Sequence, residues 1–526
     1  MRHMPLASLA LATLLALGSL PLHAADETKD APKAQSDKGD KDKDKNEKSD
    51  EQPTPADRTV VTKHSVRVGN RTINYQATAG RMLIRDDKGK PTVSFFYVAY
   101  TADGGKGGKG GKRPVTFFYN GGPGSSSMWL HMGSYGPVRV ANDGDKPIPP
   151  APYRFVPNEY SLLDKSDLVF IDAPGTGYSQ LVGKTEGKDV WGVDQDADAF
   201  TRFISRWVST NNRWNSPKFL FGESYGTTRS AVLVKSLQEK GMEFNGVVLM
   251  SSILDFTVAA PGIDHGYIVN LPTEAAIAWY HNKVPNKPAD IGAFLAEVRR
   301  FASGEYTLAL SKGDNIDPAE ADRVANQMSR YLGLSPQYIK EANLRIGPSR
   351  FRKELLRDQR LTVGRLDGRF QGIDPDAAGE TPDGDTASDA ITGAFVATFN
   401  QYIATELKFT EDRPYLPNNY AAIGKNWDWK RKKNGGWLQA TYVGDDLGDA
   451  MRRNPHLKVF SANGYYDLAT PFYATEFDLS HLGLEPAERK NITYGFYPSG
   501  HMIYIDQQSL QQSKADLSRF YDDAAP

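Results

Sequence analysis

A serine flanked by glycines is the first candidate for chemistry. The segment Gly222-Glu223-Ser224-Tyr225-Gly226 follows the apolar stretch 219–221 and precedes a helix-like run of apolar residues. A sharp turn between a strand and a helix crowds its neighbours, so the positions two before and two after the serine must be nearly free of side chains. We predict that Ser224 is a nucleophile at the end of a strand; the structural alternative is a solvated serine in a tight turn.

A serine hydroxyl needs a base, and in proteins with this turn an acid and then a histidine follow the serine in the chain. Of the five histidines after Ser224, only His501 lies in a Gly-His loop directly after an apolar stretch. Asp467 comes just after another such stretch, 458–462, and an Asn-Gly turn. The order and the positions predict a catalytic triad of Ser224, Asp467 and His501.

A glycine-rich loop offers backbone donors for the same chemistry. Asn120-Gly121-Gly122-Pro123-Gly124 follows the apolar stretch 115–119. Glycines let backbone amides approach a substrate closely, so this loop can stabilise the negative oxygen that develops during acyl transfer. We predict that the N–H groups of Gly122 and Tyr225 form the oxyanion hole; a plain glycine turn is the alternative.

The elements that must position these residues alternate between strand-like and helix-like patterns. Apolar residues recur at helical spacing from Phe200 to Val208, and a final amphipathic helix carries Leu510, Leu517 and Phe520. Alternation of this kind predicts an α/β protein with a mostly parallel central sheet and helices on both faces. The predicted core strands are 115–119, 167–172, 218–221, 246–250, 457–462 and 491–497.

The chain divides into five parts by composition. A short basic start, an apolar run from Leu6 to Leu22 and a small-residue end predict a signal peptide over 1–25, whether cleaved or kept as an anchor. The protein is therefore expected to be exported, periplasmic or secreted, with no integral membrane segment after removal of the signal. The other parts are a disordered charged linker (26–58), a core in two pieces (59–254 and 441–526) and an inserted, largely helical cap (255–440).

The overall composition excludes several functions. With 63 Lys and Arg against 64 Asp and Glu, the net charge of the 526 residues is -1, which gives no electrostatic reason to expect nucleic acid as a partner. The chain has no cysteine, so disulfides, thiolate metal sites and a cysteine nucleophile are absent. We expect no metal and no cofactor, and the oligomeric state cannot be read from the sequence.

Five motifs together resemble the serine carboxypeptidase family, which has the α/β-hydrolase fold. They are Asn-Gly-Gly-Pro-Gly-x-Ser-Ser, Gly-Glu-Ser-Tyr-Gly, Asn-Gly-x-x-Asp and Gly-His-Met, with Asp172 to Ser179 as a shortened fifth motif. The similarity extends from about Thr59 to the C-terminus and is weakest in the inserted region. The chain thus resembles a bacterial-type, exported member of this family.

The resemblance implies release of C-terminal residues from peptides through an acyl-enzyme on Ser224. It also implies that Asn120 and Glu223 bind the terminal carboxylate of the substrate. Two carboxylates within hydrogen-bonding distance cannot both stay ionised at low cost, so Glu223 must be protonated. The expected activity is therefore favoured at acidic pH.

Three positions depart from the family pattern. Phe118 stands where the family commonly has Trp, Ser134 where it has a second Glu before a Gly-Pro pair, and Ser125 where it often has Cys. The first two changes remove partners of the carboxylate site but leave acyl transfer intact. An acyltransferase or esterase with the same triad is therefore the alternative enzyme, and an exported binding protein with an inactive hydrolase fold is the alternative that is not an enzyme.

Overall fold

The computed structural model describes residues 52–103, 113–142, 144–260, 262–435 and 441–525. The predicted signal peptide and residues 26–51 of the predicted linker lie outside these ranges. Within them, no helix is both long enough and apolar enough to cross a membrane.

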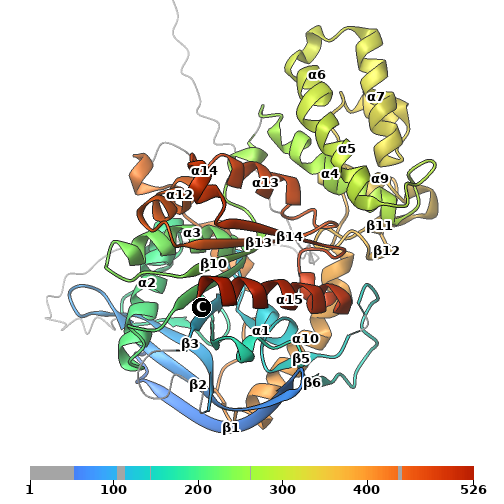
Figure 1. Cartoon of the computed structure of the whole chain (residues 1–526). Coiled ribbons are helices and arrows are strands. Elements are labelled where there is room, and N and C mark those ends of the chain that lie inside the picture. Colours follow the sequence, from blue (N-terminus) through green and yellow to red (C-terminus); the bar gives the residue numbers. More distant parts are fainter. Residues whose placement is uncertain (1–51, 104–112, 143, 261, 436–440, 526) are drawn as a thin grey trace, which may run out of the picture. The chain divides into compact units, whose positions relative to one another are not determined.

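A ten-stranded sheet runs through the centre of the structure (Figure 1). Its strands follow the order β1-β2-β3-β7-β4-β9-β10-β13-β14, with β8 paired to β3. All neighbours from β7 to β14 are parallel, whereas β1, β2, β3 and β8 pair in antiparallel fashion. The strands are β1 (Arg58–Val68), β2 (Arg71–Arg85), β3 (Pro91–Ala102), β4 (Val115–Tyr119), β7 (Asp167–Ile171), β8 (Gln180–Leu181), β9 (Lys218–Ser224), β10 (Gly246–Ser252), β13 (Lys458–Gly464) and β14 (Ile492–Tyr497).

Two apolar layers cover the two faces of this sheet. In β4, Phe117 and Tyr119 belong to one layer and Phe118 to the other, because successive side chains of a strand point to opposite faces. The helices α2 (Val193–Thr210), α3 (Tyr225–Gln238) and α12 (Gly444–Arg453) contribute to one layer. The helices α1 (Met128–Gly133), α10 (Thr386–Thr405) and α15 (Gln507–Ala524) contribute to the other. The predicted α/β fold is confirmed.

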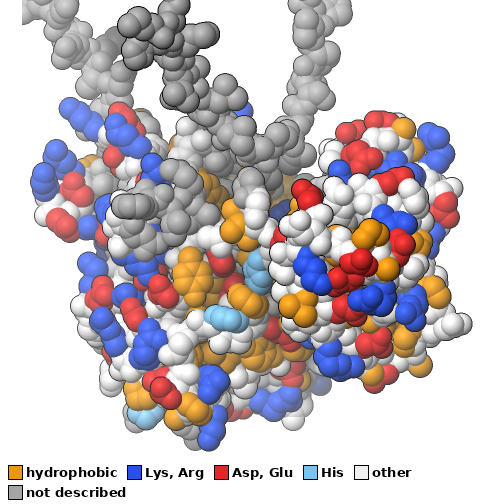
Figure 2. All heavy atoms as spheres, turned by 90° about the horizontal axis from the view of Figure 1, so that it is seen from above, with side chains coloured by type: hydrophobic (Ala, Val, Ile, Leu, Met, Phe, Trp, Pro, Cys, Tyr) orange, Lys and Arg blue, Asp and Glu red, His pale blue; other side chains and the backbone are white. Residues whose placement is uncertain are grey.

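A third apolar core lies among the helices that follow β10. It is built by α4 (His265–Tyr280), α5 (Ile291–Phe301), α6 (Thr307–Ser311), α7 (Pro318–Leu332), α8 (Pro336–Glu341) and α9 (Pro348–Glu354). Asp290, Asp317 and Ser335 start α5, α7 and α8 by accepting hydrogen bonds from backbone N–H groups of the first turn. Figure 1 shows these helices grouped together, and Figure 2 shows acidic and basic side chains intermingled over their surface.

The rest of the predicted cap region lies against the core. Helix α10 packs on α1, and short bridges join Leu416 to Gly177 and Asn418 to Ser125. That 255–440 acts as a cap stays a prediction. The remaining elements are two small sheets, β5 (Val138–Val140) with β6 (Phe155–Pro157) and β11 (Leu361–Val363) with β12 (Gln371–Ile373), and the helices α11 (Tyr420–Ile423), α13 (Phe472–Ser480) and α14 (Pro486–Arg489).

The end of the predicted linker contacts the folded part. Gln52 exchanges two backbone hydrogen bonds with Gly183, at 2.8 and 3.0 Å. The Asp57 carboxylate accepts a hydrogen bond from the Leu83 N–H at 2.7 Å and pairs with Arg206 at 2.5 Å. Residues 52–58 therefore contribute to packing, although their composition resembles that of the preceding stretch.

These contacts predict two different outcomes for N-terminal truncation. Deleting residues 26–50 should leave the melting temperature nearly unchanged, because this stretch has no Val, Ile, Leu or aromatic side chain to bury. Extending the deletion through Asp57 should lower it by several degrees. Scanning calorimetry of both variants tests this, and a drop of more than about 5 °C in the shorter deletion would contradict the prediction.

Candidate active site

Ser224 occupies the strained turn between β9 and α3. Its backbone has φ +60° and ψ -131°, a conformation that residues other than glycine rarely adopt. A Cβ atom on Gly222 would lie 2.2 Å from the Gly226 carbonyl oxygen, and one on Gly226 would lie 2.8 Å from that of Tyr119. Both positions must therefore be glycine for the turn to close.

His501 is held by a well-bonded carboxylate. Its Nδ1 atom donates to Oδ2 of Asp467 at 2.8 Å. Asp467, which is fully buried, also accepts hydrogen bonds from the backbone N–H groups of Ala469 and Thr470 and from the Thr470 hydroxyl, at 2.6 to 3.0 Å. This arrangement fixes the imidazole tautomer and leaves Nε2 free to accept a proton.

The environment raises the pKa of His501. Burial by itself disfavours the imidazolium form, but the charge of Asp467 and the hydrogen bond to it outweigh burial, and Glu223 adds to their effect. The pKa of His501 therefore lies above its ordinary value. A larger fraction of the base is protonated, and hence inactive, on the acid side.

Parallel strands explain why residues far apart in the sequence meet here. Ser224 ends β9, Asp467 follows β13 and His501 follows β14, so all three lie at the carboxyl edge of the sheet. Ser251, at the end of the intervening β10, has φ +51° and donates its hydroxyl to the His501 carbonyl at 2.6 Å. Sequence reasoning missed Ser251, because a serine at a strand end carries no distinctive signal.

The loop from Asn120 to Gly124 lies against the nucleophile turn. A Cβ atom on Gly121 would come within 2.4 Å of the Tyr225 nitrogen, which places the loop backbone directly beside this amide. Buried Arg229 donates to the Asn120 carbonyl at 2.7 Å and is itself paired with Asp196 at 2.6 Å. The backbone around Gly122 is thus held near Tyr225, as an oxyanion hole requires.

Asn120 and Glu223 form a buried pair next to Ser224. The Asn120 side-chain amide donates to Oε1 of Glu223 at 2.7 Å, and its own carbonyl oxygen accepts the Leu130 N–H at 3.0 Å. Burial raises the pKa of Glu223 to about 7, although attraction to His501 opposes the rise. The carboxyl group beside the nucleophile is therefore largely neutral on the acid side of pH 7.

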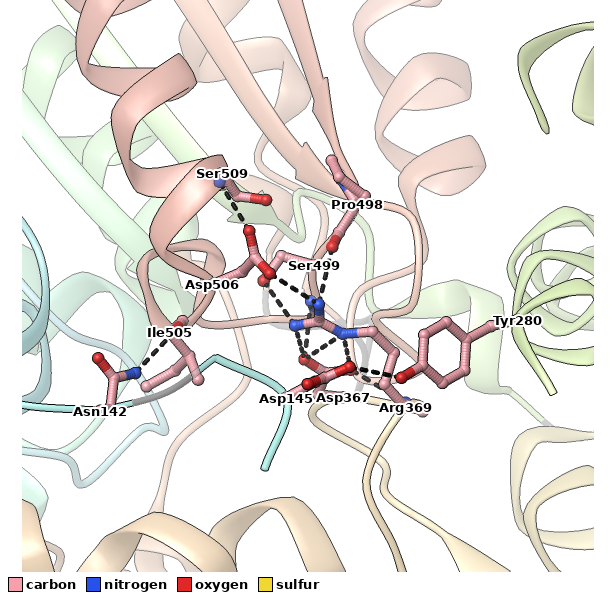
Figure 3. Close-up of polar contacts among 12 residues, drawn as sticks. Asn142, Asp145, Tyr280, Asp367, Arg369, Pro498, Ser499, Ile505, Asp506 and Ser509 are labelled. Atoms are coloured by element: carbon pink, nitrogen blue, oxygen red, sulfur yellow. Dashed lines mark hydrogen bonds and ion pairs between the residues drawn. The ribbon is translucent and has the colours of Figure 1, made fainter. Parts of the chain in front are cut away.

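Residues 366–369 of the inserted region hold the loop that carries His501, and Figure 3 shows the contacts of Arg369 with Asp367, Asp506 and Pro498. Asp367 accepts the Gly500 N–H at 3.1 Å, and the Leu366 carbonyl accepts the N–H of His501 at 2.6 Å. Buried Arg369 pairs with Asp367 at 2.7 Å, with Asp506 at 3.1 Å, and donates to the Pro498 carbonyl at 2.9 Å. These residues lie in a polar stretch of sequence that gave no sign of the role.

A second inserted segment holds the oxyanion loop. The Asn419 N–H donates to the Gly124 carbonyl at 2.8 Å, and the Pro417 carbonyl accepts the Ser126 N–H at 3.0 Å. The hydroxyl groups of Tyr420 and Ser125 are hydrogen-bonded at 2.5 Å. Ser125, the position where the family often has cysteine, thus joins this segment to the loop without a covalent bond.

The assembled groups are suited to acyl transfer. A strained serine, a histidine oriented by a carboxylate, backbone donors and a neutral carboxyl group lie at one edge of the sheet. Among the described residues, no cluster of three or more His, Asp or Glu side chains is arranged to hold a metal ion. The described hydrogen bonds do not include one between Ser224 and His501, a contact that often forms fully only with substrate bound.

Comparison with known proteins agrees with this architecture. Residues 70–271 match the serine carboxypeptidase family, a range that includes Asn120, Glu223 and Ser224 and ends before Asp467 and His501. A crystal structure of a prohormone-processing carboxypeptidase from Saccharomyces cerevisiae superimposes with a TM-score of 0.50 at 16% identity, covering 85% of this chain and 92% of that one. At that identity the superposition shows the fold. Residues 70–271 are therefore similar to the serine carboxypeptidase family, and the chain has the α/β-hydrolase fold.

Proteins of similar sequence include carboxypeptidases and a protein named as a lyase. The pheromone-processing carboxypeptidase KEX1 of Saccharomyces cerevisiae is 35% identical over 133 residues, which are 24% of this chain and 17% of the yeast protein. Serine carboxypeptidase-like 45 of Arabidopsis thaliana is 23% identical over 283 residues, 52% of this chain and 55% of that protein. The P-(S)-hydroxymandelonitrile lyase of Sorghum bicolor is 23% identical over 250 residues, 45% of this chain and 44% of that protein.

The triad geometry makes a prediction that does not depend on the substrate. A fluorophosphonate probe should label Ser224 in the parent protein and should not label Ser224→Ala. His501→Ala should slow labelling by roughly 10³-fold or more, because the base and the nucleophile act as one unit, and Asp467→Asn should slow it less. Labelling of His501→Ala within tenfold of the parent rate would remove this histidine from the mechanism.

The raised pKa of Glu223 predicts a pH-dependent effect on stability. Between the ordinary carboxyl pKa and about 7, the folded protein keeps a proton that the unfolded chain releases, so ionisation costs stability as the pH rises. Glu223→Gln keeps an acceptor for Asn120 and removes this cost. Its gain over the parent should be small at pH 4.5 and grow to at most about 3 kcal/mol at pH 8.

Urea unfolding at the two pH values measures this difference. Glu341→Gln, at an exposed position, is the control and should show the same offset from the parent at both pH values. If the gain of Glu223→Gln were equal at pH 4.5 and pH 8, Glu223 would not be the titrating group.

Proposed function

We propose that the protein is an exported serine carboxypeptidase-like hydrolase that releases C-terminal residues from peptides, with turnover that falls above about pH 7 as Glu223 ionises. The match of residues 70–271 to the serine carboxypeptidase family supports carboxypeptidase chemistry, and the signal-like sequence of residues 1–25 supports export to the periplasm or the medium. The triad is Ser224, Asp467 and His501.

One observation carries the proposal. A buried glutamic acid whose pKa is raised to about 7 stands directly before the nucleophile and is hydrogen-bonded to Asn120. In its neutral form Glu223 can donate a hydrogen bond to a carboxylate, and a peptide presents a carboxylate next to its last amide bond. An esterase or a general acyltransferase has no need for a neutral carboxyl group at this point.

The chemistry follows from the geometry. His501 Nε2 accepts the proton of Ser224 as Oγ attacks the carbonyl carbon of the last peptide bond, and the resulting oxyanion accepts hydrogen bonds from the N–H groups of Gly122 and Tyr225. His501 then protonates the departing amino group as the C–N bond breaks. Water attacks the acyl-enzyme with His501 again as base, which restores Ser224 and frees the shortened peptide.

An acyltransferase or esterase with the same triad is the second candidate. Phe118 and Ser134 favour it, because they replace two polar partners of the family's carboxylate site. The sequence similarity to a plant protein named as a lyase also shows that relatives differ in their reactions. In an acyltransferase an alcohol, rather than water, would intercept the acyl-enzyme.

The two candidates predict different pH profiles for a matched pair of substrates, a peptide with a free C-terminal acid and its carboxamide. Turnover of the free acid should be bell-shaped: protonation of His501 removes the base at low pH, and ionisation of Glu223 repels the substrate carboxylate above about pH 7. The carboxamide has no charge to repel, so its alkaline limb should be weaker.

Glu223→Gln cannot ionise and should flatten the alkaline limb for the free-acid peptide. Measurement of kcat/KM from pH 4 to pH 9 for both substrates and both proteins decides the question. Equal alkaline limbs in the parent, unchanged in Glu223→Gln, would exclude a carboxylate-reading role and favour the acyltransferase or esterase.

A further inference from the structure

Two buried polar atoms beside the nucleophile have no hydrogen-bond partner among the described residues. They are Oε2 of Glu223 and the hydroxyl of Tyr504. The two residues are 3% and 2% exposed, so solvent does not replace the missing partners. Buried polar groups are nearly always paired, and an unpaired one needs an explanation.

Tyr504 lies in the short helical turn Ile503–Ile505 that follows His501. Its ring fills the space left by Gly133: a Cβ atom at that position would come within 2.3 Å of the ring. The hydroxyl lies beside both Glu223 and Asn120, and its geometry does not form a well-aligned hydrogen bond with either of them. Burial raises the pKa of Tyr504 well above its ordinary value, so the hydroxyl stays protonated and can donate.

Two of the three positions that depart from the family pattern, Phe118 and Ser134, stand where the family has polar partners of the carboxylate site, but they do not act as partners of Glu223 here. Phe118 is stacked between Phe170 and Phe221, with ring centroids 4.7 and 4.6 Å apart. The Ser134 hydroxyl donates to the Leu130 carbonyl at 2.6 Å, within its own helix. Tyr504, which lies beside both Glu223 and Asn120, is therefore the side chain available to supply a further polar group to this pair.

We propose that Tyr504 is a specificity-determining residue whose hydroxyl, with Glu223 and Asn120, binds the free α-carboxylate of a peptide substrate. The inference rests on the proposed function and assigns one more residue to that site. Because Oε1 of Glu223 accepts from Asn120, the carboxyl proton lies on Oε2. Oε2–H and the Tyr504 hydroxyl are then two donors for the two oxygens of one carboxylate, and a carboxamide would place its own N–H groups against a donor.

Tyr504→Phe tests the inference with the same free-acid and carboxamide peptides. Loss of a hydrogen bond to a charged group should lower kcat/KM for the free acid by about tenfold or more, mainly through KM. The value for the carboxamide should change little. Tyr521→Phe is the control, because it removes another buried hydroxyl, bonded to Thr116 at 2.8 Å in the core, and should keep the parent's preference.

Each outcome has one reading. Suppose that the parent prefers the free acid. If Tyr504→Phe then keeps this preference, or loses activity equally on both substrates, the role of Tyr504 alone is overturned. A parent with no preference for the free acid overturns the proposed function, and the role of Tyr504 with it. If Tyr504→Phe does not fold, 3-fluorotyrosine at position 504 keeps the ring and strengthens the donor; it should increase the preference, and an unchanged preference overturns the inference.

Discussion

The left-handed backbone of Ser224 is the constraint on which the site depends. A chain can reverse from strand to helix within one residue only if that residue takes a positive φ and its neighbours leave room, which Gly222 and Gly226 do. The same turn sets the position of the Tyr225 amide and lets Gly121 approach it. The nucleophile and the oxyanion donors are therefore two results of one piece of backbone geometry.

The inserted region does more than add helices beside the core. Its residues Leu366, Asp367 and Arg369 hold the loop of His501, and its segment 417–420 holds the oxyanion loop. The apolar core of α4 to α9 also includes Tyr466 and Leu468, on either side of Asp467. The loops of Asp467 and His501 and the glycine-rich loop thus all contact the inserted region, so substitutions in that region can change the geometry of the candidate site.

Glu223 and His501 have opposite tendencies to carry charge. Burial disfavours the charged form of both groups and keeps Glu223 neutral, whereas the charge and hydrogen bond of Asp467 outweigh burial at His501 and favour its positive form. Because Glu223 and His501 influence each other, the protonation of one shifts that of the other. The site has neutral Glu223 and neutral His501 together only over a limited pH range, and for this reason we predict a bell-shaped profile.

The sequence alone determined the α/β class and the core strands, because apolar runs make buried strands. It also predicted a site of Ser224, Asp467 and His501, because a Gly-x-Ser-x-Gly turn needs its glycines and each of the three residues follows or ends an apolar stretch. The sequence also showed that two polar partners were missing at Phe118 and Ser134, but not what had replaced them. Ser251 contacts His501, 250 positions later in the chain, and Arg369 contacts Pro498, 129 positions later. Tyr504 lies beside Glu223, which is 281 positions earlier. Only the folded sheet decides such contacts, since it brings the ends of distant strands to one edge and buries an unpaired hydroxyl beside Glu223.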